Sequence, residues 1–252
     1  MYIGSHNSGS YSVSTDFGVG QFTPVPAWLS FFFVRWSKCH EKDVYSQLMK
    51  GSRYIDLRVC RSHLDGELRT EHTVYGEKLS ILLGQICRFL IDYPSEIVIL
   101  FCHKFRSGFD HVEDHDSFLK LLVETFPDHD TSFVRRNEFS APYSELISRN
   151  RRIMVIYGDE RVVKNSSLSL HSPLECQIDH WFNKSNVQEL EQSIESYRPW
   201  MDGEGRKVKM PAAATLTLTA LDYISSFPSL LSISSLSSRI LYHPASSLFS
   251  LL

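Results

Sequence analysis

Short apolar runs alternate with segments of helical periodicity along most of this chain, and this order constrains the fold more than any other feature. Residues 53–59, 96–102 and 153–157 are short runs dominated by strand-forming residues, which predicts strands. Residues 77–92 and 114–126 repeat apolar side chains at helical spacing, which predicts helices between those strands. Repeated strand-then-helix order indicates an α/β protein with a parallel sheet and helices outside it, open or closed into a barrel.

Weaker patterns predict further elements: strands at 70–74, 174–179 and 215–219, a short helix at 143–149, and a helix over 186–197 capped by Asn186. No linker divides the chain, so we expect one domain over residues 1–224. From residue 225 the chain is mainly Ser and Leu, with one Arg and no acidic residue. We predict a poorly ordered tail over 225–252, with a short amphipathic helix over 230–241 as the alternative.

The overall composition excludes some classes of function. A formal net charge of −3 and a pI near 6.4 argue against a general nucleic-acid-binding protein. The five cysteines are scattered, odd in number and without metal-ligand spacing, which predicts free thiols in a reducing compartment. No secretory signal pattern begins the chain, and no apolar run is long enough to span a bilayer. We therefore expect a cytoplasmic protein whose membrane contact, if any, is peripheral.

Two histidines flank a strand that carries both an acid and an arginine. His6 lies in a turn of small residues near the start, and His72 lies at the end of a predicted strand. Side chains alternate along residues 54–59, so Asp56 and Arg58 share one face of that strand. Two histidines and an arginine around one pocket are what phosphodiester cleavage by general acid–base catalysis requires.

Four sequence blocks, in one order, resemble the X-domain-containing proteins of the phosphatidylinositol-specific phospholipase C superfamily: residues 3–11, 51–59, 72–76 and 93–100. The resemblance covers roughly residues 3–104, with similar later blocks at 153–160, 179–183 and 214–217. It implies a distorted TIM-type barrel with the active site at the C-terminal ends of its strands. In that family the last strand carries an Asp that orients the first histidine, and no such motif follows Asp222. We therefore expect a barrel that is incomplete at its last strand.

The resemblance also implies roles for individual residues. His6 would be the general base that deprotonates the inositol 2-hydroxyl, and His72 the general acid that protonates the leaving diacylglycerol oxygen. Arg58 would offset the charge that develops on the phosphoryl oxygens. Asn7 would bind the 2-hydroxyl or a phosphate oxygen, and Asp56 would orient Arg58 or a hydroxyl.

Two further residues complete the expected substrate site. His103 and Lys104, at the end of the apolar run 96–102, are candidates for substrate binding. The other histidines lack ligand spacing and are left unassigned.

Arg58 also bears on the cofactor. The calcium-dependent branch of the superfamily has a carboxylate where Arg58 stands, and calcium requires several oxygen ligands. The resemblance therefore implies a site without metal or other cofactor, in which Arg58 supplies the positive charge.

An aromatic run at residues 28–36 allows two interpretations. It is either a core or capping segment, or an interfacial element that inserts at the depth of lipid headgroups. In the second interpretation, replacing Phe31 and Phe32 with Ser reduces vesicle binding without unfolding the protein.

Three functions remain open from the sequence. The first is a phosphoric diester hydrolase that acts on phosphatidylinositol or a related phospholipid at a membrane surface. The second is a catalytically silent protein that binds lipid or inositol phosphate, because the terminal strand is not evident. The third is a glycerophosphodiester phosphodiesterase, which needs carboxylate metal ligands near the first histidine; Asn7 and Arg58 argue against it.

Overall fold

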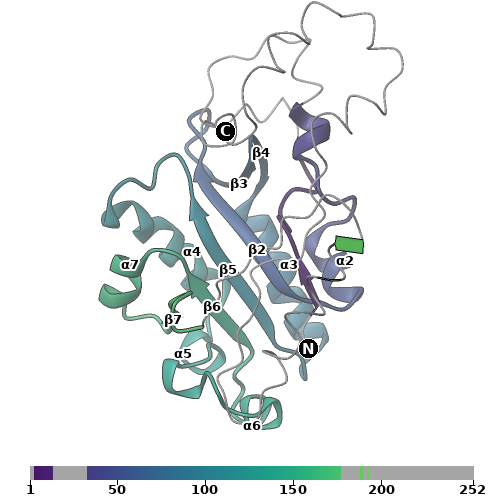
Figure 1. The fold of residues 1–252 in the computed structure, drawn as a ribbon. Coiled ribbons are helices and arrows are strands. Elements are labelled where there is room, and N and C mark those ends of the chain that lie inside the picture. Colours follow the sequence, from purple (N-terminus) through teal and green to yellow (C-terminus); the bar gives the residue numbers. More distant parts are fainter. Residues whose placement is uncertain (1–2, 14–32, 177–187, 190–191, 193–252) are drawn as a thin grey trace, which may run out of the picture. The chain divides into compact units, whose positions relative to one another are not determined.

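The computed structural model describes residues 3–13, 33–176, 188–189 and 192 (Figure 1). Residues 3–13 and 33–176 lie in the first of two compact units, which comprises residues 1–179 and 204–210. In the second unit the described residues 188, 189 and 192 are helical, within the helix predicted over 186–197. The predicted strand at 215–219 and the tail from 225 lie outside the described residues.

The first unit contains one mixed sheet. Its described strands are β1 (Ile3–Ser5), β2 (Ser52–Arg61), β3 (Leu68–His72), β4 (Val74–Lys78), β5 (Val98–Phe105), β6 (Ile153–Tyr157) and β7 (Leu170–His171). The strand order is β4-β3-β2-β5-β6-β7, with β1 paired to β2. β2, β5, β6 and β7 run parallel, whereas β3 and β4 form an antiparallel extension.

Helices connect and flank these strands (Figure 1). They are α2 (Val44–Met49), α3 (Leu79–Asp92), α4 (Asp116–Thr125), α5 (His129–Ser132), α6 (Tyr143–Ser148) and α7 (Glu160–Asn165), with 3₁₀ turns η2 (Val112–His115) and η3 (Arg136–Glu138). Residues 33–37 are also helical. In the described part of the chain the sheet runs from β4 to β7 without closing, which is consistent with the predicted distorted TIM-type barrel.

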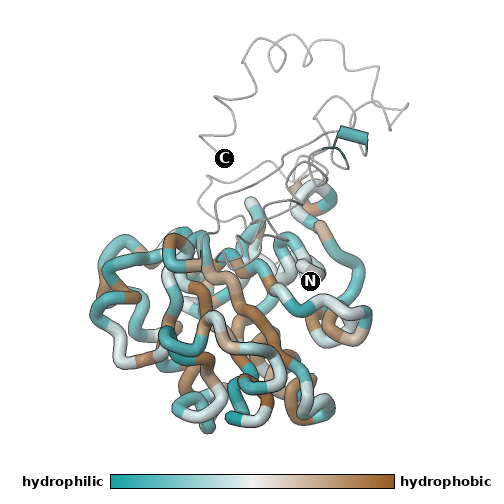
Figure 2. Tube along the Cα trace, turned by 60° about the horizontal axis from the view of Figure 1, so that its bottom comes forward, coloured by the Kyte–Doolittle hydropathy of each residue, from teal (hydrophilic) through white to brown (hydrophobic). Residues whose placement is uncertain are grey.

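The core lies between the sheet and its covering helices. One face of α3 is fully apolar because its hydrophobic residues recur at helical spacing, and its buried residues are Leu79, Leu82, Leu83, Ile86, Phe89 and Leu90. Burial of each such side chain stabilises the folded state by about 1.5–3 kcal/mol, because its apolar surface leaves water. Figure 2 shows the hydrophobic residues concentrated along the central strands. α3 ends at Asp92, two residues before Pro94, as predicted.

One predicted strand is wrong over its described part. Residues 173–176 form a turn, and the strand β7 lies earlier in the chain. The cause is local hydrogen bonding around Ser172. Its hydroxyl accepts from the backbone N of Leu174 at 3.0 Å, and its carbonyl accepts from the backbone N of Cys176 at 3.1 Å. Serine commonly closes turns through such bonds, which compete with a strand.

Candidate active site

At the centre of the site, the strands β1 and β3 both pair with the same edge of β2. β5 pairs with Tyr54–Val59 along one edge of β2. β1 pairs with Tyr54 and Ile55, and β3 pairs with Val59 to Arg61, so both must use the opposite edge. β1 runs toward β3 and stops short of it. The ends of both strands therefore meet beside the middle of β2, which places His6 and His72 near each other although 66 positions separate them in the chain.

The alternation predicted for β2 is confirmed. Ile55, Leu57 and Val59 are fully buried in the hydrophobic core. Asp56 and Arg58 face the other side, where they are 3% and 7% exposed. They line a pocket together with Asn7, Glu71 and His72.

The loop after β1 is tied to β2 by reciprocal hydrogen bonds. The backbone N of Ser8 donates to the carbonyl of Asp56 at 2.9 Å, and the backbone N of Asp56 donates to the Ser8 hydroxyl at 3.1 Å. Asn7 turns the chain with a φ of 49°, a conformation that Asn tolerates better than most residues. This turn holds His6 and Asn7 against the middle of β2.

His6 and Arg58 are in direct contact. Nη2 of Arg58 lies 3.1 Å from Nε2 of His6. Because a guanidinium can only donate, Nε2 accepts this bond and carries no proton. Burial lowers the pKa of His6 to about 4, and the charge of Arg58 adds to that effect while Asp56 opposes it. His6 is thus held as a neutral imidazole whose basic nitrogen faces Arg58, a residue that lines the pocket.

The carboxylate of Asp56 lies between His6 and His103 and is close to both. Its Oδ2 accepts from the backbone N of Asn7 at 2.9 Å and lies 3.9 Å from Nε2 of His6. Its Oδ1 lies 3.1 Å from Nδ1 of His103. Burial opposes ionisation, but His103, Arg58 and the Asn7 amide outweigh it and lower the pKa of Asp56. Asp56 is therefore a buried carboxylate that favours a proton arriving on His6.

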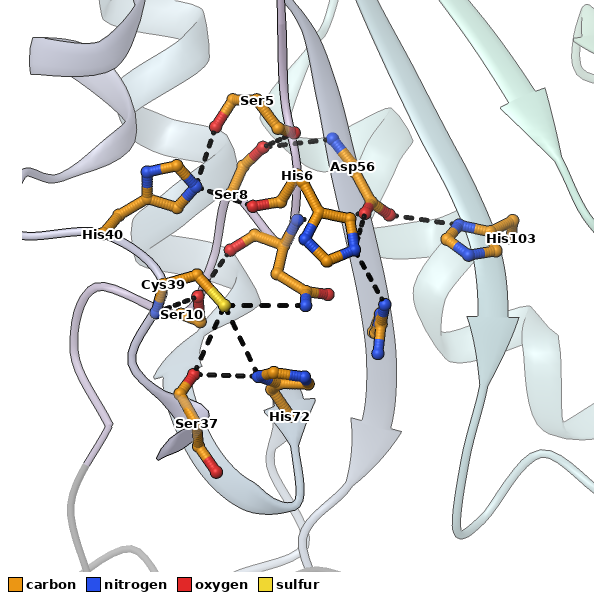
Figure 3. Close-up of polar contacts among 12 residues, drawn as sticks. Ser5, His6, Ser8, Ser10, Ser37, Cys39, His40, Asp56, His72 and His103 are labelled. Atoms are coloured by element: carbon orange, nitrogen blue, oxygen red, sulfur yellow. Dashed lines mark hydrogen bonds and ion pairs between the residues drawn. The ribbon is translucent and has the colours of Figure 1, made fainter. Parts of the chain in front are cut away.

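His72 is the last residue of β3, and the backbone carbonyl of Ser37 binds its imidazole ring (Figure 3). Its Nδ1 lies 2.9 Å from the carbonyl oxygen of Ser37, which can only accept, so Nδ1 carries a hydrogen. Nε2 remains available for a proton transferred to substrate. Burial, followed by the charge of Arg58, lowers the pKa of His72 to about 4.

The remaining two predicted residues lie on β5. His103 contacts Asp56 and stacks on Phe101, with ring centroids 4.4 Å apart. Lys104 pairs in register with Arg58, and burial together with the charges of Arg58 and Arg106 lowers its pKa to about 8. All seven predicted site residues are therefore brought into one neighbourhood.

Sequence reasoning missed three residues of this neighbourhood. Nε2 of His40 donates to the carbonyl of His6 at 2.6 Å, and Sγ of Cys39 lies 3.6 Å from Nδ1 of His72. Glu71 lines the pocket with a buried carboxyl group. Neither Cys39 nor His40 has a spacing that relates it to His6, so no sequence signal could have found them. Position next to His72 was the only signal for Glu71.

The cysteines are free thiols, as predicted: Cys39, Cys60, Cys87, Cys102 and Cys176. Among the described residues, no three His, Cys, Asp or Glu side chains form a group suited to a metal ion. The pocket does not fit calcium, because the guanidinium of Arg58 stands beside Asp56 where a cation would need oxygen ligands. No helix in the described part of the chain is both long and apolar enough to cross a membrane.

Known proteins share both sequence and fold with this chain. It is 28% identical over 201 residues to PI-PLC X domain-containing protein 1 of Homo sapiens, covering 78% of this chain and 57% of that protein. It is 27% identical over 214 residues to the variant-surface-glycoprotein phospholipase C of Trypanosoma cruzi, covering 77% and 54%. The chain thus spans a little over half the length of these relatives. No family model matches it.

Solved structures confirm the predicted fold class. The phosphatidylinositol-specific phospholipase C from Listeria monocytogenes aligns with a TM-score of 0.59 at 18% identity, covering 90% of this chain and 78% of that one. The Staphylococcus aureus enzyme aligns with a TM-score of 0.56 at 15% identity, covering 89% and 77%. The chain is thus similar in sequence to PI-PLC X domain-containing protein 1 and similar in fold to these two phospholipases.

Proposed function

We propose that the chain is a phosphoric diester hydrolase that cleaves phosphatidylinositol-type lipids without a metal ion. The headgroup 2-hydroxyl attacks the phosphorus, which yields a cyclic inositol phosphate and releases diacylglycerol. The observation that carries this proposal is the 3.1 Å contact between Arg58 and Nε2 of His6. A neutral base thus lies beside a fixed cation. Cleavage of a phosphodiester requires the base to accept the hydroxyl proton and the cation to bind the phosphoryl oxygens.

His6 acts as the general base. When a phosphodiester binds, the guanidinium of Arg58 turns its hydrogen bonds toward the phosphoryl oxygens and leaves Nε2 for the hydroxyl proton. The resulting imidazolium lies 3.9 Å from Oδ2 of Asp56, which stabilises its charge. The low pKa of His6 keeps the base unprotonated at neutral pH.

His72 acts as the general acid. The Ser37 carbonyl holds its Nδ1–H, so the transferable proton is on Nε2. In the free protein, burial and Arg58 lower the pKa of this group to about 4. A bound phosphodiester anion reverses that effect, because a negative charge nearby favours the imidazolium. Proton donation is therefore coupled to substrate binding.

The metal-free part of the proposal rests on Arg58. Its guanidinium is always charged and already bonded at the pocket, so it performs the charge neutralisation that a divalent ion would supply. Lys104, beside it on β5, adds a second positive group for the phosphate.

The low pKa of His72 supports a second candidate, a silent protein that binds lipid or inositol phosphate. A histidine that stays neutral at pH 7 delivers no proton to a leaving group, so the pocket would bind its ligand through Arg58 without cleaving it. Both candidates place the protein at a membrane surface as a peripheral partner of phosphatidylinositol or a related phospholipid. The cytoplasmic location stays a prediction. Within the aromatic run, Phe31 and Phe32 lie outside the described residues, and Trp36 is 42% exposed.

The test is release of cyclic inositol phosphate from mixed vesicles that contain phosphatidylinositol, followed by ³¹P NMR. We expect turnover by the full chain and a loss of at least about 10³-fold in the His6→Ala, His72→Ala double variant, since each proton-transfer partner contributes about 10²–10⁴-fold. His129→Ala, in α5, is the matched control and keeps full turnover.

Each outcome decides between the candidates. Turnover that survives in the double variant contradicts the assignment of both histidines. Vesicle binding without any release by the unmodified chain supports the silent candidate. EGTA leaves turnover unchanged if Arg58 replaces the ion, whereas loss in EGTA and recovery with calcium would show that the site depends on metal.

A further inference from the structure

Glu71 has a buried carboxyl group that the proposed chemistry does not use. It lies on β3 directly before His72, is only 6% exposed, and lines the same pocket as Arg58. Its Oε2 has no partner of good hydrogen-bond geometry among the described residues, and the only side-chain donor that lowers the pKa of Glu71 is the thiol of Cys60, a weak donor. A buried acceptor left without a donor costs about 1–3 kcal/mol, so this atom needs an explanation.

The polar neighbours of Glu71 on β3 are bonded to the protein itself. Thr70 donates its hydroxyl to the carbonyl of Gly9 at 3.0 Å. Arg69 donates to the carbonyl of Gly76 at 3.1 Å and to Asp65 at 2.7 Å. None of these bonds goes to Oε2 of Glu71, and Glu71 lines the pocket. A donor on a bound ligand would satisfy it.

The surrounding charges narrow the kind of donor. Burial raises the pKa of Glu71, whereas the charges of Arg106 and Arg58 lower it in part. A phosphate would bind on the Arg58 side, because two anions about 4 Å apart repel by roughly 4 kcal/mol at an effective dielectric constant of 20. A cationic amine would face Arg58, Lys104 and Arg106. A neutral hydroxyl group is the donor that fits this position.

We propose that Glu71 selects the headgroup, with Oε2 accepting a hydrogen bond from a ring hydroxyl of a polyol phosphate whose phosphate lies on Arg58. The same carboxylate disfavours headgroups that carry additional phosphates. This inference rests on the proposed function, because it takes the phosphate position from Arg58. It adds a specificity residue to that site.

The test is equilibrium binding measured by calorimetry, which does not depend on turnover. The probes are myo-inositol 1-phosphate, methyl phosphate, phosphoethanolamine and inositol 1,4-bisphosphate. For Glu71→Met we expect about a tenfold or greater loss of affinity for myo-inositol 1-phosphate but no loss for methyl phosphate, which has no ring hydroxyl group.

Glu71→Gln separates the acceptor from the charge. The amide keeps an acceptor oxygen, so affinity for myo-inositol 1-phosphate changes by no more than a few-fold. Loss of the negative charge raises affinity for inositol 1,4-bisphosphate by about tenfold. If Glu71→Met does not fold, as judged by its thermal unfolding, this second variant still tests the proposal.

Two results overturn the role of Glu71: unchanged selectivity in both folded variants, or tighter binding of phosphoethanolamine than of myo-inositol 1-phosphate. Neither result bears on turnover of phosphatidylinositol, which tests the proposed function separately. Arg58→Met tests the phosphate position, since it should abolish methyl phosphate binding. Unchanged methyl phosphate binding in that variant would show that the phosphate lies elsewhere.

Discussion

At the scale of single residues, the site depends on where a few charges sit. Arg58 contacts the base His6 at 3.1 Å and lies in the same pocket as the acid His72. Burial lowers the pKa of both imidazoles, and the positive charge of Arg58 lowers them further. Asp56 works in the opposite direction on His6. The base is therefore unprotonated before substrate arrives and is stabilised once it has taken a proton.

Arg58→Met should raise the pKa of His6. The variant removes a positive charge 3.1 Å from Nε2 and leaves Asp56 with one cation fewer nearby. Because burial is the largest cause of the lowered value, the pKa of His6 should rise but stay below 6.5. NMR titration of labelled histidine measures it.

Arg161→Met is the control for that titration. Arg161 lies on α7 and pairs at 2.6 Å with Asp159, the residue that caps this helix. Its charge is not among those that shift the pKa of His6. This variant should leave the His6 titration unchanged. An unchanged or lowered His6 pKa in Arg58→Met would contradict the electrostatic role given to Arg58.

At the scale of elements, the approach of β6 to β5 supports the site from behind. The backbone N of Gly158, just after β6, donates to the carbonyl of Cys102 at 2.8 Å. A Cβ at Gly158 would lie 2.7 Å from both Cα and O of His103. Backbone atoms cannot yield as a flexible side chain does, so only glycine lets the two strands approach this closely.

Two Gly→Ala variants should therefore have opposite effects on the free energy of unfolding. Gly158→Ala should lower it by about 1–3 kcal/mol, because the added methyl group forces β5 and β6 apart at His103. Gly84→Ala, at an exposed position of α3, meets nothing within 4 Å and should raise it by about 0.5–1 kcal/mol through helix propensity. Urea unfolding measures both. Equal effects in the two variants would contradict the close approach at His103.

At the scale of the whole molecule, the buried histidines link stability to pH. The folded state holds the pKa of both His6 and His72 at about 4, against an ordinary value of 6.5. The unfolded chain therefore binds more protons between these two values. The contribution of these two histidines to the free energy of unfolding is fully present above pH 6.5 and is lost as the pH falls toward 4.

Comparison of the unmodified chain with the His6→Gln, His72→Gln variant tests this linkage. Between pH 7 and pH 4.5 the unmodified chain should lose up to about 2 kcal/mol more per histidine than the variant, which cannot titrate at these positions. Urea unfolding at each pH gives the free energies. Parallel pH profiles for the two proteins would show that neither imidazole is held neutral by the fold.

Most of the first unit could be predicted because its patterns are local. The helical spacing of apolar residues over 77–92 and the apolar run at 153–157 each describe one element, and both are confirmed. The prediction at 174–179 is wrong over its described part because side-chain hydrogen bonds of Ser172 close a turn there. Such bonds depend on geometry that residue types alone do not specify.

Local patterns of residues are enough to predict the strand-and-helix order, the alternation that puts Asp56 and Arg58 on one face, and the resemblance to the phospholipase family. The pairing of β1 and β3 along one edge of β2, which brings His6 to Arg58, is visible in the folded chain and has no local signal. The folded chain alone reveals His40 behind His6 and the buried carboxyl group of Glu71. The physical reason is that periodicity records how a residue faces its own element, whereas contacts and pKa values depend on elements that are distant in the chain.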